Sequence, residues 1–313
     1  MRFKQTLISI LLVLMTITVF SDGGFFRIAD PIGPYMIRSD MQRAAILYDE
    51  ENNEEKLILQ IVLNSELDRV GWIIALPSMP QMYEWEHEDI FEVLNNITNK
   101  ALSDDDSKRP GCVGMVGGCS ASGGDGLYFH ETITVGQLDL TPIQAENSEA
   151  LITWLVKNEV SFADIDEEVK TELRDIMDTY IQNNWVFIYG KFNIEQGYYG
   201  NTQLLTFDFD VGMPFYPMQL TKIQQKIFHQ DYLDVRLWLI ADDYYRFITI
   251  KDNQPAPYNE YVGVDYNEHF SIEPGETTQK VLELESAAAK QISFFSFEYS
   301  DSRAFEDIWF ATK

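Results

Sequence analysis

The sequence contains few cysteines and few basic residues, and no long apolar run follows its first 21 residues. Cys112 and Cys119 are its two cysteines, which excludes a disulfide-rich scaffold and a four-cysteine zinc site. The 23 Lys and Arg are set against 50 Asp and Glu, a formal net charge of −27. Because such a chain repels phosphate backbones, we expect no nucleic-acid partner.

Length and composition are those of a globular protein. The chain has 313 residues, of which 45% are hydrophobic and 13% aromatic, and these fractions exclude a disordered or collagen-like chain. At about 150 residues per domain, one or two domains are expected. No later segment reaches about 18 consecutive apolar residues, so we expect no transmembrane span in the mature chain.

The N-terminus has the pattern of a secretory signal peptide. Arg2 and Lys4 precede an apolar run over residues 7–20, which is shorter than the roughly 20 residues that cross a bilayer core. The alternative, a buried N-terminal helix, is disfavoured because the run has no polar face. We therefore predict a signal peptide over residues 1–21, with cleavage between Ser21 and Asp22. The mature protein, with charge −29, would be soluble and either periplasmic or extracellular.

Hydrophobic periodicity predicts a mixture of strands and helices in the mature chain. Apolar runs over 43–49 and 56–64 predict a β-hairpin, and 70–76 predicts a strand buried on both faces. Further strands are predicted at 127–140, 185–192, 203–211, 235–240, 245–250 and 291–299, and helices at 87–102, 147–160, 164–182 and 277–289. Residues 252–275 contain three prolines and are predicted to form a connecting loop. Because the two kinds of element do not alternate regularly, we predict an α+β fold, mostly antiparallel, with two or three amphipathic helices and no doubly wound sheet.

Several short segments follow one another in a characteristic order. They are Gly23–Phe26, Gln42–Ile46, Gly71–Pro80, the helices at 147–160 and 164–182, the strand at Trp185, and Pro214–Leu220. In this order they resemble the bacterial secreted proteins grouped as domain of unknown function 2330, over roughly residues 22–250. The resemblance implies an exported bacterial protein with no assigned activity, and it brings no catalytic residues.

The resemblance also suggests a domain organisation. We expect a signal peptide over 1–21, an α+β domain over 22–250, and a C-terminal extension over 251–313 that packs on the same domain. Family members often have cysteines flanking the Gly-Gly-Phe-Phe segment. This chain has Asp22 and Arg27 there, so neither a bridge nor a lipid anchor is expected at that place.

The two cysteines lie in a Gly-rich segment, residues 103–126, which is long for a loop and therefore of functional interest. In an exported protein two nearby thiols usually pair, so we predict a Cys112–Cys119 disulfide. Closing so short a loop would stabilise the fold by about 2 kcal/mol. A metal site and a catalytic cysteine near His130 are weaker alternatives, because further ligands and activating groups are lacking.

Other chemical signatures are weak, so catalytic residues stay unknown and no metal site is predicted. His87, His130, His229 and His269 include no pair four residues apart, and Ser120 and Ser122 do not form a nucleophile elbow. Acidic runs such as Asp104–Asp106 and Asp208/Asp210 leave calcium as the one candidate cofactor, without EF-hand spacing. Aromatic clusters such as 207/209 and 215–216 are interpreted as core.

The leading hypothesis is a non-enzymatic exported protein that binds a protein, peptide or glycan partner, with the 103–126 segment as a candidate contact. Whether it is an enzyme stays open. One alternative is an extracellular hydrolase that uses carboxylates in a cleft. Another is a calcium-stabilised module.

Intact mass tests the N-terminal and cysteine predictions together. We expect the exported protein to begin at Asp22 and to take up a thiol-alkylating agent only after reduction, because the two thiols are already paired. Two thiols that react without reduction would contradict the disulfide. An uncleaved N-terminus would contradict the signal peptide.

Overall fold

A computed structural model describes residues 23–28, 37–103, 126–162, 165–228, 233–251, 254–257, 264–284, 288–299 and 307–312. The predicted cleavage site at Ser21–Asp22 and the predicted Cys112–Cys119 disulfide lie outside the described residues, and so does His229.

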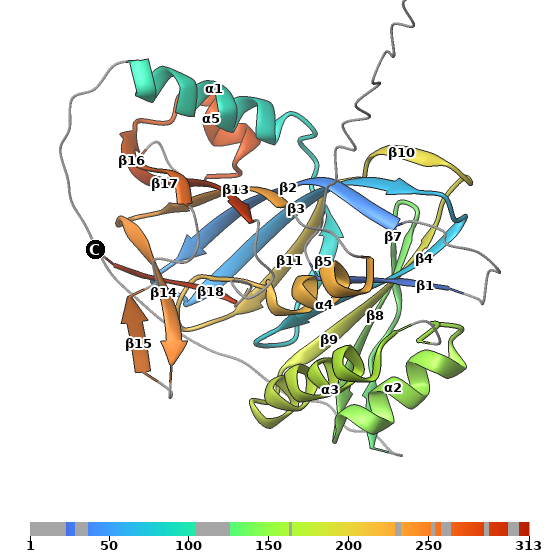
Figure 1. Ribbon diagram of the computed structural model, residues 1–313. Helices are drawn as coiled ribbons and strands as arrows, with labels where there is room; N and C mark the ends of the chain where they lie inside the picture. The colour runs from blue at the N-terminus through green and yellow to red at the C-terminus, as the bar shows by residue number, and fades with distance from the viewer. Residues whose placement is uncertain are drawn as a thin grey trace, which may run out of the picture.

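The molecule has four layers, with two large β-sheets packed face to face and helices on the outer face of each (Figure 1). The eight-stranded sheet has the order β16 (Val264–Ile272), β17 (Lys290–Tyr299), β13 (Leu233–Ala241), β2 (Ile37–Asp49), β3 (Glu54–Ser65), β11 (Leu205–Asp210) and β5 (Gln81–Glu84), with β10 (Tyr198–Asn201) also on β3. The six-stranded sheet has the order β1 (Gly24–Arg27), β4 (Arg69–Leu76), β9 (Val186–Asn193), β8 (Leu138–Ala145) and β6 (Leu127–Phe129), with β7 (Ile133–Val135) also on β8.

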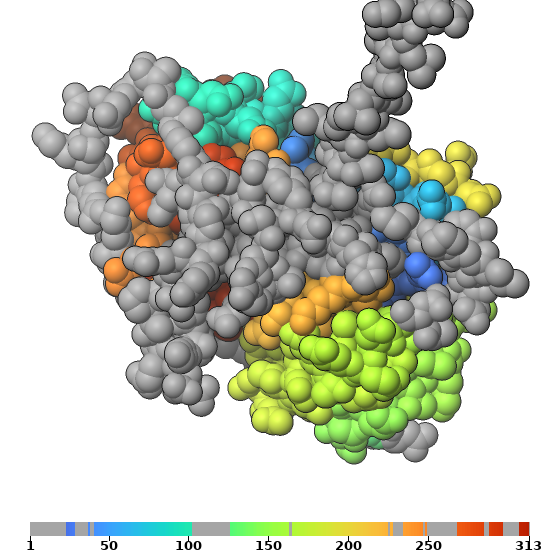
Figure 2. Space-filling view, viewed as in Figure 1, coloured from blue at the N-terminus to red at the C-terminus, as the bar shows by residue number. Residues whose placement is uncertain are grey.

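Helices cover both outer faces. The outer face of the eight-stranded sheet packs against α1 (Ile90–Ser103) and α5 (Glu276–Val281). The outer face of the six-stranded sheet packs against α2 (Ser148–Lys157), α3 (Glu167–Gln182) and α4 (Gln219–Phe228). Figure 2 shows α2 and α3 together at one end of the molecule with α4 beside them. A small sheet joins β12 (Phe215–Tyr216), β18 (Ile308–Thr312), β14 (Tyr245–Lys251) and β15 (Gln254–Pro257).

Strand β4 is the clearest product of this layering. Trp72 and Ile74 point into the core between the sheets, while Ile73 and Ala75 point into the core under the helices. All four side chains are at most 1% exposed, which confirms the prediction that this strand is buried on both faces. Burial of a side chain such as Ile contributes roughly 1.5–3 kcal/mol.

The predicted α+β class is confirmed. Every pairing between described strands is antiparallel except that of β2 with β13, and the 43–64 hairpin forms as β2 and β3. The predicted loop at 252–275 is wrong, because this segment contains β15 and β16. Prolines do not prevent β15, since it pairs only with β14 among the described strands and an edge strand tolerates them. Helix α4 was not predicted from the sequence.

Three helices end without glycine at the position that most often has it. In α2, α3 and α5 the residue that follows the C-cap has a left-handed backbone. These residues are Glu159 (φ 68°), Asn184 (φ 61°) and Glu283 (φ 49°). The next amide then bonds back to the carbonyl five residues earlier, as Trp185 does to Tyr180 at 3.0 Å. Glycine usually marks such helix ends. Because α2 has no glycine there, its end was predicted at residue 160, three residues after its observed end at Lys157.

Asp307 is a buried carboxylate that ties three parts of the chain together. It is 5% exposed and precedes β18. Its oxygens accept the hydroxyl of Tyr180 at 2.8 and 3.0 Å, the amide of Met218 at 2.7 Å and that of Gln219 at 3.0 Å. The two amides are at the N-terminus of α4, where the helix dipole favours a negative charge. Burial and the neighbouring carboxylate raise the pKa of Tyr180 well above its ordinary value.

Glu55 is a second buried carboxyl group, with a different environment. It is 0% exposed, and one oxygen accepts a hydrogen bond from the amide of Phe215 at 2.8 Å, while the other has no hydrogen-bond partner among the described residues. Burial raises the pKa of Glu55 well above its ordinary value, only partly offset by this hydrogen bond. The fold therefore favours the protonated acid at this position.

Removing the Asp307 carboxylate should destabilise the protein strongly. We expect Asp307→Ala to cost roughly 3–5 kcal/mol of unfolding free energy, because it leaves the Tyr180 hydroxyl and two amides unpaired in the interior. The matched control, Asp175→Ala on the exposed surface of α3, should change stability by less than about 0.5 kcal/mol. Urea unfolding measures both. Equal effects of the two variants would contradict this role.

Glu55 should make stability depend on pH. Its folded pKa is raised, so the folded protein keeps a proton that the unfolded chain releases, and stability falls as pH rises from the unfolded pKa toward the folded one. The slope is about 1.4 kcal/mol per pH unit for one proton. Glu55→Gln should flatten this part of the profile between pH 5 and pH 8, measured by urea unfolding, while Glu51→Gln in the exposed turn should not. Parallel profiles for wild type and Glu55→Gln would contradict the expectation.

Candidate ligand-binding pocket

A pocket lies where the end of α3 meets the β6–β8 edge of the six-stranded sheet. Its volume is about 360 Å³, within the range of small-molecule sites. It is lined by Tyr128, Gln144, Ala145, Glu146, Ile181, Asn184 and Trp185. These residues come from β6, from the end of β8 and the residue after it, and from the end of α3 with the segment that joins it to β9, so the fold assembles the pocket from three separate stretches of sequence.

One wall is built by the end of α3. The left-handed backbone of Asn184, which asparagine tolerates well, reverses the chain and directs Trp185 back onto the helix. The indole of Trp185 stacks on the ring of Tyr180, with centroids 4.7 Å apart and planes at 19°. The two residues that close the helix end therefore also form the pocket wall.

Aromatic neighbours hold Trp185 in place. Its ring meets Phe215 edge-on at 4.9 Å and Trp309 at 6.0 Å, while the hydroxyl of Tyr180 is fixed by Asp307. These contacts come from α3, β12 and β18. Since each neighbour is anchored in the core, the indole is preorganised before any ligand arrives.

The opposite wall consists of polar side chains on paired strands. Tyr128 of β6 lies directly across from Gln144 of β8. The hydroxyl of Tyr128 donates to Glu146 at 3.3 Å, and the Gln144 amide oxygen lies 3.3 Å from Nε2 of His130. The backbone amide of Glu146 donates to Gly126 at 2.7 Å, so the end of the 103–126 segment lies at this wall.

The lining combines two amides, a phenol and an indole with apolar surface from Ile181 and Ala145. Glu146 is the single acid among the lining residues, and none of them is Lys, Arg or His. Such a set can donate and accept hydrogen bonds around an apolar floor, which suits recognition of a small polar molecule. Within the described ranges, no group of three or more His, Cys, Asp or Glu could hold a metal ion.

The acidic pair Asp208/Asp210, considered above for calcium, lies away from the pocket on the outer face of the eight-stranded sheet. Asp208 is hydrogen-bonded to Glu54 and Tyr83, and it lies 3.9 Å from the Lys56 ammonium. Burial raises the pKa of Asp208, and burial together with the Asp208 charge raises the pKa of Glu54.

The structure brings one of the histidines singled out from the sequence to the pocket. His130 lies behind Gln144, whereas His269 is elsewhere, with Nδ1 2.9 Å from Oγ of Ser293. That serine is fully buried and also accepts the amide of Tyr245 at 3.1 Å, so its contacts are those of a packed core group.

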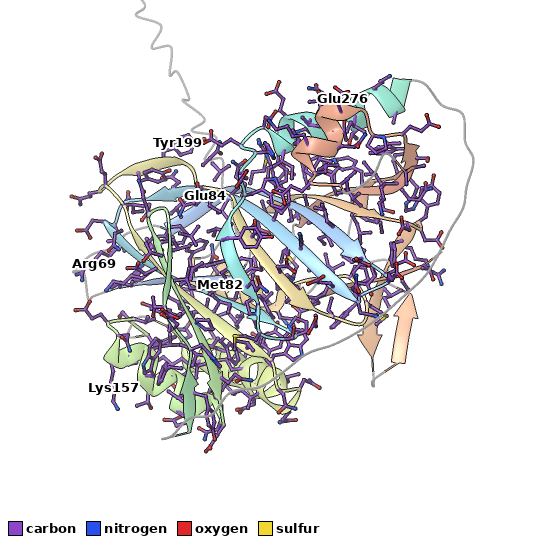
Figure 3. The ribbon with its side chains drawn as sticks, turned by 180° about the vertical axis from the view of Figure 1, so that it is seen from behind. Arg69, Met82, Glu84, Lys157, Tyr199 and Glu276 are labelled. Carbon is purple, nitrogen blue, oxygen red and sulfur yellow. The ribbon has the colours of Figure 1, made fainter. Side chains whose placement is uncertain are left out.

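Of the aromatic clusters, Phe207, Phe209, Phe215 and Tyr216 are buried, as predicted for core residues. Tyr199, in contrast, is 67% exposed and lies at the periphery on β10 (Figure 3).

Sequence reasoning missed Gln144, Glu146, Asn184 and most of the other lining residues. One signal was available: Trp185 directly follows Asn183 and Asn184 at the end of the clearest helix, a usual place for a left-handed residue. No local pattern in the sequence shows that β8 lies across the pocket from Trp185.

No helix in the described ranges has the length and apolar character of a membrane span.

Comparison with known proteins gives a family assignment and little else. No curated protein matches the chain. Among solved structures, baculovirus P35 aligns over 88% of this chain and 91% of its own at 10% identity, with a TM-score of 0.37. Two structures of a mutated baculovirus P35 after caspase cleavage give TM-scores of 0.37 and 0.39, at 10% and 8% identity, over 87% of this chain and 94% and 97% of theirs. TM-scores below 0.5 do not establish a shared fold, and nothing about this protein follows from them.

A family model described as an uncharacterized protein conserved in bacteria (DUF2330) matches residues 28–310. The match confirms the resemblance seen in the short segments and extends well past residue 250. The chain therefore belongs to the DUF2330 family of bacterial proteins.

Proposed function

We propose that this protein is an exported bacterial protein that acts by binding a small polar ligand, or a small part of a larger one, in the pocket between α3 and the β6–β8 edge. The observation that carries the proposal is the preorganised wall of Trp185, held by Tyr180, Phe215 and Trp309. Export is supported by the signal-like pattern of residues 1–21 and places the protein in the periplasm or outside the cell.

The composition of the pocket favours binding over hydrolysis by paired carboxylates. Glycosidases of that kind use two carboxyl groups about 5–10 Å apart. Glu146 is the one acid among the lining residues, and it already accepts the hydroxyl of Tyr128. The other polar groups of the lining are two amides, a phenol and an indole, and none of them is a second carboxyl group.

A calcium-stabilised module has less support. The carboxylate of Asp208 accepts a hydrogen bond from Tyr83 and lies 3.9 Å from the Lys56 ammonium, so a cation would have to compete with both groups. The 103–126 segment remains a proposed contact for the ligand, supported by the hydrogen bond between Gly126 and Glu146 at the pocket wall.

The site is tested by deleting one amide without straining the backbone. Asn184→Gly removes a lining side chain at a position whose φ of 61° suits glycine. Asn53→Gly is the matched control, since Asn53 has a φ of 51° in the distant β2–β3 turn. Thermal shift measured with sugars, amino acids, short peptides and nucleosides should identify a class that stabilises the wild type. At ten times Kd the expected stabilisation is about 1.4 kcal/mol.

We expect Asn184→Gly to reduce this stabilisation and Asn53→Gly to leave it unchanged. Absence of stabilisation by every class would contradict the proposed function. An effect that survives in Asn184→Gly would place the binding elsewhere.

A further inference from the structure

We infer that the pocket takes an uncharged, hydroxyl-rich ligand, namely one neutral sugar unit of a glycan. This inference rests on the proposed function and names the chemical class that the same site would recognise. It follows from three properties of the lining: its charge, the packing of its aromatic rings, and the kinds of polar group it presents.

The charge of the lining disfavours anions. The carboxylate of Glu146 is its single charged group, and the whole chain has a formal charge of −27. A phosphorylated, sulfated or carboxylated ligand would meet repulsion from Glu146, and none of the described lining residues is a Lys or Arg that could pair with it. Because Glu146 is exposed, salt screens this repulsion, and the preference against anions should be strongest at low ionic strength.

The packing of the aromatic rings disfavours a cationic ligand. Recognition of an ammonium group uses the open faces of aromatic rings that surround the charge. The indole of Trp185 is already stacked on Tyr180 and packed against Phe215 and Trp309. The pocket therefore lacks an aromatic cage, and Glu146 alone would have to hold the cation.

The polar groups match those of a sugar. Each hydroxyl of a sugar donates and accepts hydrogen bonds, and the amides of Gln144 and Asn184 offer both functions in one plane. Glu146 adds an acceptor, while Ile181 and the exposed part of Trp185 supply apolar surface for the C–H groups of the ring. The contact between His130 and Gln144 fixes the orientation of that amide.

The size of the pocket agrees with this assignment. A hexose displaces a volume of roughly six water molecules, about 180 Å³. The pocket volume of about 360 Å³ is large enough for one such unit. A ligand of about 12 heavy atoms held by such contacts is expected to bind with a Kd of about 1 mM.

Saturation-transfer NMR on the full mature protein provides the test. The neutral probes are glucose, galactose, N-acetylglucosamine, cellobiose, lactose and chitobiose. Glucuronate and glucose 6-phosphate are the anionic counterparts, glucosamine is the cationic one, and triglycine represents a peptide. We expect a neutral sugar to bind more tightly than its charged counterparts. Asn184→Gly should weaken its binding at least tenfold and Asn53→Gly less than twofold.

A second variant tests the electrostatic part of the argument. Glu146→Gln keeps the shape of the side chain and removes its charge. The variant should bind glucuronate more tightly than the wild type does. The ratio of the glucuronate Kd to the glucose Kd should therefore fall at least fivefold. An unchanged preference would overturn the role given to Glu146.

The outcomes separate the ligand class from the site itself. Tighter binding of an anion, an amine or triglycine that is lost in Asn184→Gly would overturn the sugar assignment and leave the pocket as the binding site. Neutral-sugar binding that Asn184→Gly does not weaken would overturn the pocket as the place of recognition. Absence of binding by every probe would overturn the sugar assignment and count against the proposed function as well.

Discussion

The central strands of both large sheets are covered on both faces, and most features of the molecule follow from that constraint. A strand in this position has no solvent face, so β4 is apolar at nearly every residue, and β2 places Ala44 and Ile46 in one core and Ala45 in another. Many polar and acidic residues therefore lie in turns, at sheet edges and on outer helix surfaces. Glu84 at the end of β5 and Glu276 at the start of α5 are exposed examples, both labelled in Figure 3. The high acidity of the chain is therefore a property of its periphery.

Polar groups that do lie inside are handled in two ways. Asp307 keeps two amides at the start of α4 and the hydroxyl of Tyr180 as partners, an arrangement suited to a charged carboxylate. Among the described residues Glu55 has one amide partner, and its burial favours the neutral acid. The contacts of Asp307 hold separate layers together, while the burial of Glu55 makes the stability of the fold depend on pH.

The pocket occurs where the layered arrangement ends. At the β6 edge the six-stranded sheet has no further described strand, and α3 finishes close to the same place. The helix terminus supplies a turn that redirects the chain, and the sheet edge supplies side chains that are only half covered. The same anchor that begins α4 also fixes Tyr180, and through it Trp185, so the rigidity of the pocket wall derives from the core.

The sequence by itself determined the features that depend on neighbouring residues. The β2–β3 hairpin, the buried character of β4 and the α2 N-cap, where Asn147 accepts the amide of Ala150 at 2.9 Å, all follow from local spacing and are present in the structure. The family also followed from the order of short segments, each read locally.

Only the tertiary structure decided what depends on distant residues. The parallel pairing of β2 with β13 joins segments nearly 200 residues apart, and Asp307 closes a contact with Tyr180 across 127 positions. The pocket likewise unites Tyr128, Gln144 and Trp185 from separate elements. Periodicity tells which face of an element is buried, but not which element covers it, because that choice is made by packing, which is a property of the whole chain.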